Sequence, residues 1–188
     1  MVVSTPSFFD AFAHWNVSAG QQSAVHRGEI LLHPQVHPSG GGSATAQMYL
    51  PMARDLAWSQ LTNYSRWVHY FTDITNSRLL AVDADNPACK RIYQMARKAF
   101  LFLTAEVEIY LRVTERSQQK IEFRLERGNF VDFSADLYLQ DWQAGTLMTY
   151  SVCATPSIPV PSFVVQQALQ LELPANMRNM RRTLCPGS

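Results

Sequence analysis

Charged residues are scarce in this chain, and neither sign dominates. Only 16% of the 188 residues are Asp, Glu, Lys or Arg, against about 25% in an average soluble domain. Sixteen basic residues stand against fifteen acidic ones, so the formal net charge is +1. A chain without an excess of one sign has no long-range field to attract a polyanion. We therefore expect no nucleic-acid partner.

Cysteines are also few, and long apolar runs are missing. Cys89, Cys153 and Cys185 are odd in number and far apart, which excludes a disulfide framework and the paired spacing of a zinc site. No stretch of about 18 apolar residues could span a bilayer, and no signal-peptide pattern opens the chain. We expect no integral membrane segment, no metal, no cofactor and a cytoplasmic location.

Alternating apolar residues are abundant between Arg91 and Thr155. "VEIYLRV" and "KIEFRLERG" place apolar and polar residues in turn, and "FVDFSADLYLQDW" and "TLMTYSVCAT" follow after short turns. Period-two alternation is typical of strands with one buried and one solvated face. The pattern predicts an antiparallel meander whose inward positions are Val107, Ile109, Leu111, Val113, Ile121, Phe123, Leu125, Val131, Phe133, Leu137, Leu139, Met148, Tyr150 and Val152.

Three prolines between 156 and 161 end the last of these strands, because proline cannot donate to the ladder. A long helix follows, since one apolar stripe then steps by three or four residues. The stripe consists of Val165, Leu169, Leu173, Met177, Met180 and Leu184. Only the inward face of the meander is large enough to take this stripe. A curved sheet around a long helix predicts a hollow between them.

The first half of the chain predicts smaller elements. Residues 24–51 indicate a hairpin around the glycines 40–42, and residues 53–71 indicate two short helices that meet near Thr62 and Asn63. Before them, Phe8, Phe9, Phe12 and Trp15 are spaced as in a short amphipathic helix. We expect residues 1–44 to form an extension, with a short helix, an extra strand and a surface for a protein partner, and residues 45–188 to form one α+β domain.

Three pieces of the chain, within about residues 45 to 184, contain Pro51, Trp58, Leu61–Tyr64, Trp67, Phe71, Tyr150, Pro156–Pro161 and Met177–Arg181. With these residues the chain resembles a known family, the START-like superfamily with the helix-grip fold. More narrowly, they are similar to its polyketide cyclase/dehydrase and ubiquinone-binding-protein-like group. The resemblance implies a curved antiparallel sheet that grips a C-terminal helix around a cavity for lipids, sterols, polyketides or quinones.

We interpret the chain first as a binder of a hydrophobic small molecule, which needs burial and no chemistry. The residues expected to line its cavity are Trp58, Tyr64, Trp67, Phe71, Phe102, Phe123, Phe133, Tyr150, Val165 and Leu169. One alternative is an aromatase/cyclase or dehydratase in the same cavity. Another is an interaction protein that docks through its N-terminal helix.

An enzyme would need a proton donor, and the inward positions are almost all apolar. Tyr150 is the one hydroxyl among them, and His69 lies beside Trp67 and Phe71 in the sequence. These two are the weak catalytic candidates. A buried phenol usually has a hydrogen-bond partner, so we also hypothesise that Tyr150 and Tyr64 orient a ligand oxygen.

Overall fold

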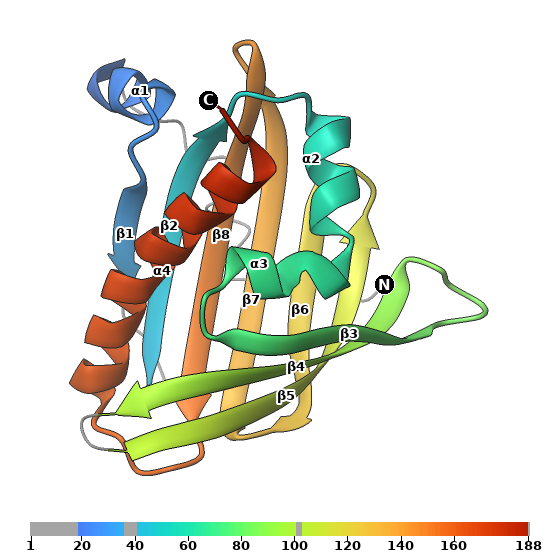
Figure 1. Ribbon diagram of the computed structural model, residues 1–188, viewed down its shortest axis with the longest axis vertical. Helices are drawn as coiled ribbons and strands as arrows, with labels where there is room; N and C mark the ends of the chain where they lie inside the picture. Colours follow the sequence, from blue (N-terminus) through green and yellow to red (C-terminus); the bar gives the residue numbers. More distant parts are fainter. Residues whose placement is uncertain (1–18, 36–40, 101–102, 188) are drawn as a thin grey trace, which may run out of the picture.

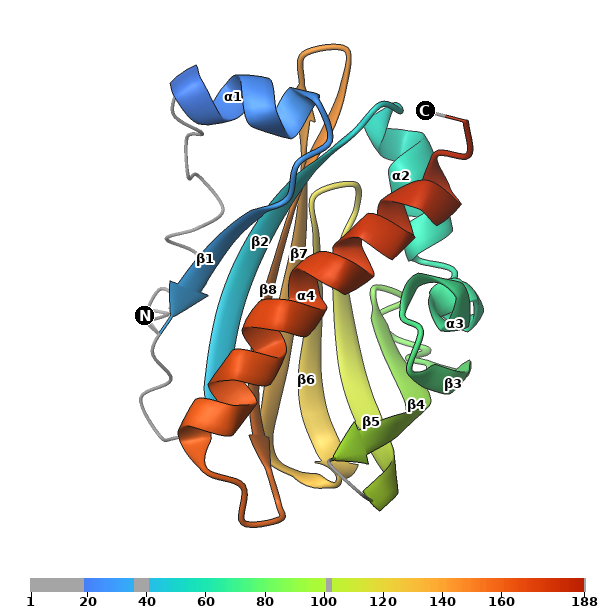
Figure 2. The ribbon, with the colours of Figure 1, turned by 60° about the vertical axis from the view of Figure 1, so that its left-hand side comes forward.

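An eight-stranded antiparallel sheet curves around one long helix in the computed structural model of the protein (Figures 1 and 2). The structure describes residues 19–35, 41–100 and 103–187. In chain order the elements are α1 Ala19–His26, β1 Leu31–Gln35, β2 Gly42–Leu50, α2 Arg54–Leu61, η2 Tyr64–Arg66, α3 Trp67–Tyr70, β3 Ile74–Val82, β4 Cys89–Phe100, β5 Leu103–Arg116, β6 Lys120–Gly128, β7 Phe130–Trp142, β8 Gly145–Pro156 and α4 Ser162–Leu184.

The strand order in the sheet is β1-β2-β8-β7-β6-β5-β4-β3. Strands β5 to β8 form the predicted meander, and β3 and β4 extend it at one edge. Strand β2 pairs with β8, so the opening hairpin closes the other edge. The predicted fold class, a curved antiparallel sheet with a C-terminal helix and short helices after the first core strand, is confirmed.

Helix α4 lies across the concave face of the sheet (Figure 2). Its predicted stripe is confirmed, because Val165, Leu173, Met177, Met180 and Leu184 are buried and Leu169 packs against the core. Pro161 occupies the N-cap position, and the helix continues through the buried Pro174. The prolines thus separate β8 from α4, as the sequence predicts.

The first turns of α4 approach β2 closely because β2 presents small residues there. A Cβ atom at Gly42 would lie 2.9 Å from the backbone nitrogen of Gln166 and 2.9 Å from Leu169 Cδ1. Ala44 and Ala46 continue the same buried face. The Gln166 side chain accepts from Ser43 N at 3.0 Å and donates to Ser43 O at 2.9 Å. These contacts hold the beginning of α4 against β2, the strand next to the edge strand β1.

Two local expectations are wrong. Val131 was expected to point inward, but its side chain is 72% exposed. A register shift between Phe130 and Asp132 changes the alternation at the start of β7, since a bulge redirects the side chains that precede it. Residues 24–26 were expected to be extended, yet they belong to helix α1. The expected helix around Phe8 to Trp15 lies outside the described residues.

In the described ranges, no helix is both long enough and apolar enough to cross a membrane. Within the same ranges, no three His, Cys, Asp or Glu side chains gather into a group that could hold a metal ion.

Candidate functional site

Five aromatic side chains from four separate elements meet between the sheet and the helices. Tyr64 comes from η2, Trp67 from α3, Phe71 from the residue after α3, Phe123 from β6 and Tyr150 from β8. The centroids of neighbouring rings lie 5.0 to 6.4 Å apart, the range in which aromatic pairs attract beyond their buried area. We call these five residues the interior aromatic cluster.

Trp67 is at the centre of this cluster. Its ring stacks on Phe71 at 5.3 Å and meets the edge of Phe123 at 5.0 Å. Its single polar atom, Nε1, donates to the carbonyl of Leu61 at 2.9 Å. The bend between α2 and α3 thus places the carbonyl of Leu61 where it accepts the hydrogen bond of the indole N–H. Trp67 therefore offers a ligand its apolar surface alone.

Tyr150 is different, because its hydroxyl has no hydrogen-bond partner among the described residues. The residue is only 4% exposed, and buried polar groups in proteins are almost always hydrogen-bonded. Burial raises the pKa of Tyr150, and the charge of Asp136 adds to the effect. At neutral pH the phenol is therefore a donor.

The hydroxyl of Tyr64 is already engaged, unlike that of Tyr150. It donates to Glu115 Oε1, which also pairs with Lys90 Nζ at 2.7 Å. Both charged side chains are largely buried, with 19% of Lys90 and 11% of Glu115 exposed. Burial raises the pKa of Tyr64, and the hydrogen bond and charge of Glu115 raise it further. The hydroxyl of Tyr64, Glu115 and Lys90 are thus bonded to one another. Tyr64 therefore contributes its ring, and not its hydroxyl, to the cluster.

Sequence reasoning did not find Lys90 and Glu115. The alternation Leu111, Val113, Glu115 on β5 contains the signal, since residues two apart share a face. Nearby, Ser77 Oγ donates to the carbonyl of Tyr64 at 2.6 Å. The concave face is thus apolar under α4 and polar near the edge formed by β3 and β4.

The remaining predicted residues lie around the cluster or outside it. Trp58, Phe133 and Leu169 pack against the core and are partly exposed. Val165 is buried on α4, and Phe102 lies outside the described residues. The side chain of His69 is exposed.

The backbone of His69 has a structural role. Its carbonyl accepts from Asn179 Nδ2 at 2.8 Å and from Thr183 Oγ1 at 3.3 Å. This residue anchors α4 to α3, and its exposed imidazole does not contribute to the cluster. No ring contact or hydrogen bond joins His69 to Tyr150 in the described part of the chain, so the two catalytic candidates are not brought together.

Two hollows in the described part of the chain lie away from the cluster. One, of about 550 Å³, is bounded by the ends of β3 and β4 and by Arg112. The other, of about 380 Å³, lies between Gly28 and the last turns of α4. Near the cluster, Met148 on β8 and Met177 and Met180 on α4 are buried members of the same core.

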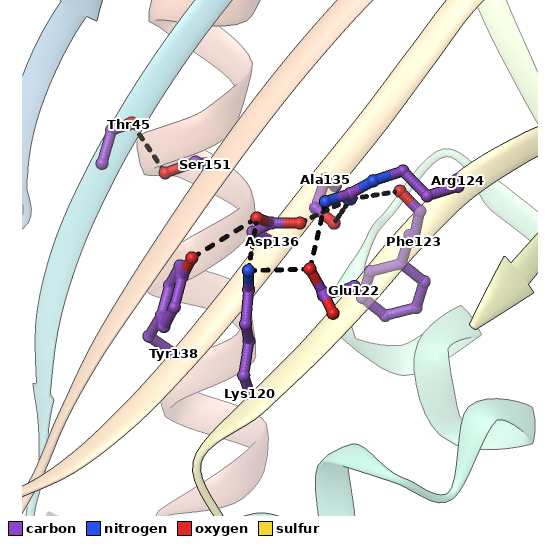
Figure 3. Close-up of polar contacts among 9 residues, drawn as sticks. All are labelled: Thr45, Lys120, Glu122, Phe123, Arg124, Ala135, Asp136, Tyr138 and Ser151. Carbon is purple, nitrogen blue, oxygen red and sulfur yellow. Dashed lines mark hydrogen bonds and ion pairs between the residues drawn. The ribbon is translucent and has the colours of Figure 1, made fainter. Parts of the chain in front are cut away.

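The opposite, convex face of the sheet carries a cluster of charges. Figure 3 shows it on the side of the strands turned away from α4. Lys120 Nζ pairs with Glu122 at 2.8 Å and with Asp136 at 3.1 Å, and Arg124 pairs with both carboxylates. Tyr138 donates to Asp136 at 3.4 Å. We call these five residues the convex-face ionic cluster.

This cluster is closed, so we assign it no ligand. Asp136 is fully buried, and the Lys120 side chain is 4% exposed. Burial alone would lower the pKa of Lys120, but hydrogen bonds to Glu122, Tyr138 and Asp136 outweigh it and raise that pKa. Arg124 also donates to the carbonyls of Phe123 and Ala135 at 2.9 and 3.2 Å. Each cation contacts two carboxylates, which favours a structural role.

The arrangement of sheet and helix is shared with solved structures. A START superfamily protein from Mycobacterium smegmatis matches with a TM-score of 0.66 at 12% identity, over 76% of this chain and 96% of that one. A fragment of a STAR-related lipid transfer protein from Xanthomonas axonopodis matches with 0.66 at 14% identity, over 82% and 93% of the two chains. The chain has the START-like helix-grip fold.

An aromatase/cyclase from a Streptomyces species has the same helix-grip fold, with a TM-score of 0.57 at 10% identity, over 76% of this chain and 90% of that one. Comparison of the sequence with protein-family profiles and with characterised proteins gives no match. The solved structures nevertheless confirm the expected superfamily fold. The narrower group within it stays a prediction.

The two tyrosines of the interior aromatic cluster predict a loss of stability in alkali. The pKa of Tyr64 and that of Tyr150 are raised in the folded state, whereas unfolded tyrosines ionise near pH 10. The stability that this difference contributes is fully present below about pH 10 and is lost as the pH rises further. Urea unfolding at increasing pH should show the loss, and the double variant Tyr64→Phe/Tyr150→Phe should show a smaller one. An equal alkaline loss in both proteins would contradict this assignment.

Proposed function

We propose that the protein binds a hydrophobic small molecule, of the size of a lipid, quinone or polyketide, between the sheet and α4. The observation that carries the proposal is the buried hydroxyl of Tyr150, which has no partner in the described part of the chain. It lies among the rings of Trp67 and Phe71. A carbonyl or hydroxyl oxygen of an otherwise apolar ligand would accept its hydrogen bond.

The surroundings of the cluster support this reading. Phe71, Phe130, Phe133 and Leu169 pack against the core but stay partly exposed, as side chains at the mouth of an apolar site do. Burying a ligand among them removes apolar area from water at about 25 cal/mol per Å², less the cost of immobilising it.

The names of the structural neighbours agree with this function. One is called a lipid transfer protein and another an aromatase/cyclase.

The alternative, a polyketide-type cyclase or dehydratase, would need an ionisable group free to exchange a proton with the ligand. Lys90 and Glu115 form an ionisable pair on the concave side, which is the observation in its favour. Their mutual contact, together with the hydroxyl of Tyr64, leaves this group engaged. Burial raises the pKa of Tyr150, so its phenol gives up a proton less readily than an ordinary tyrosine does. We therefore favour binding over catalysis.

The direct test is native mass spectrometry of protein purified from its own host, followed by extraction into organic solvent. A reproducible hydrophobic compound, bound one to one and released on unfolding, is the expected result. Protein that consistently arrives without such a compound, and that fails to take one up from a host lipid extract, would contradict the proposal.

Tyr150→Phe tests the polar contact. The variant removes one hydroxyl and keeps the ring, so we expect unchanged or slightly higher stability and an affinity reduced by up to about tenfold. Displacement of a fluorescent fatty-acid analogue by the extracted compound measures the affinity. Tyr110→Phe, on the opposite face of β5, is the matched control and should bind as the unmodified protein does. If Tyr150→Phe also leaves the affinity unchanged, the hydroxyl has no such role.

A further inference from the structure

The second hollow, of about 380 Å³, is lined by three arginines. Arg178, Arg181 and Arg182 come from the last turns of α4, and Gly28 from the turn after α1. This hollow lies outside the interior aromatic cluster, so the proposed hydrophobic ligand does not use it. Its volume lies within the range of about 300–1,000 Å³ that is typical of small-molecule sites.

Arg181 forms a fixed side of this hollow. Its Nε donates to the carbonyl of Tyr49 on β2 at 3.0 Å. Its guanidinium lies against Gly28, where a Cβ atom would be 3.0 Å from Nη1 and 3.1 Å from Cζ. Gly28 has a φ of +94°, a conformation that glycine adopts at no steric cost. A glycine at this position therefore leaves room for the arginine to lie flat against the turn.

The positive charge in the hollow is not neutralised by the described residues. None of the three arginines forms an ion pair there, and Arg182 contacts only the neutral amide of Asn179, at 3.5 Å. The acidic residue nearest in sequence to Gly28 is Glu29, which pairs with Arg27. Because the whole chain carries a net charge of +1, three unpaired cations in one place are a local concentration of charge.

Cations at the C-terminal end of a helix also stabilise the helix dipole, which is the simpler explanation of the three arginines. The dipole places about half a negative charge at the helix C-terminus, and three full positive charges exceed it. Guanidinium groups hold phosphate by paired, charge-assisted hydrogen bonds. We propose that the hollow between Gly28 and the end of α4 is a binding site for a phosphate group, carried either by a soluble phosphate ester or by a lipid headgroup.

The test compares two double variants that remove the same charge. Arg178→Gln/Arg182→Gln changes two exposed arginines of the hollow and leaves Arg181 in place. Arg97→Gln/Arg116→Gln changes two exposed arginines elsewhere, of which Arg97 pairs with the exposed Glu106. Glycerol 3-phosphate and inorganic phosphate are titrated by calorimetry. Vesicles of phosphatidylcholine, with and without phosphatidic acid, are tested by co-sedimentation.

We expect the first double variant to bind about tenfold more weakly or worse, and the second to bind as the unmodified protein does. Binding of the soluble phosphates assigns the site to a phosphate ester, and binding of the acidic vesicles alone assigns it to a lipid headgroup. Added salt should weaken either interaction, because the charges are exposed. The proposal is overturned if no phosphate probe binds, or if both double variants lose binding equally. Organic extraction of the first variant should still recover the hydrophobic ligand, which keeps the two proposals separable.

Discussion

Asp136→Ala is expected to lower the free energy of unfolding by about 3–5 kcal/mol, the usual cost of removing one partner from a buried ion pair. Asp136 is fully buried and pairs with both Lys120 and Arg124. Without it, two cations of the convex-face ionic cluster share only Glu122 among the carboxylates described here. Their desolvation would remain while half of the compensating charge is gone. Urea unfolding at neutral pH measures the change.

Asp141→Ala is the matched control for this loss of a carboxylate. Asp141 also belongs to β7 and pairs with Arg54 at 3.1 Å, but its side chain is 69% exposed. Exposed pairs contribute less than about 1 kcal/mol, so this variant should unfold almost as the unmodified protein does. Equal losses for the two variants would mean that the burial of Asp136 does not determine its contribution.

Gly42→Val is expected to lower the free energy of unfolding by about 3 kcal/mol, at the upper end of the cost of overpacking. The new side chain would begin 2.9 Å from the backbone nitrogen of Gln166 and 3.0 Å from its Cα. Backbone atoms of a helix cannot turn aside as a side chain can, so α4 would have to move away from β2. Thermal unfolding measures the loss, and increased binding of a hydrophobic dye would report the opened interior.

Gly20→Ala is the control for Gly42→Val. Gly20 lies in helix α1, and a Cβ atom there would meet nothing within 4 Å. Alanine is favoured over glycine in helices by about 0.5–1 kcal/mol, so stability should be unchanged or raised. A Gly42→Val protein as stable as the unmodified one would show that α4 is not held where the structure places it.

The sequence alone predicts most of the fold, because the buried faces of its elements have different periods. Strands β5 to β8 alternate with period two, and α4 carries a stripe with steps of three and four. Each pattern arises because one face of the strand or helix packs against the core and the other face does not. Val131 departs from the alternation because a bulge depends on how β7 pairs with β8. Helix α1 has little apolar patterning of its own.

The site is less predictable than the fold. The sequence predicts ten cavity-lining residues. The structure brings five of them together in one cluster, namely Tyr64, Trp67, Phe71, Phe123 and Tyr150. Whether they contact a ligand stays a prediction. Whether the sheet and α4 enclose an open hollow stays a prediction, because side-chain volumes along a sequence do not show how closely a helix approaches a sheet.

The polar residues show most clearly what the sequence determines and what only the tertiary structure determines. Alternation assigns a side chain to a face of the sheet, and by itself it places Asp136 on the convex side and Tyr150 on the concave side. Only the tertiary structure decides that Asp136 is fully buried between two cations, and that Tyr150 is buried without a partner among the described residues. The physical reason is that a periodicity is set by neighbours in the chain, whereas burial and hydrogen bonding depend on residues that come from distant strands and helices.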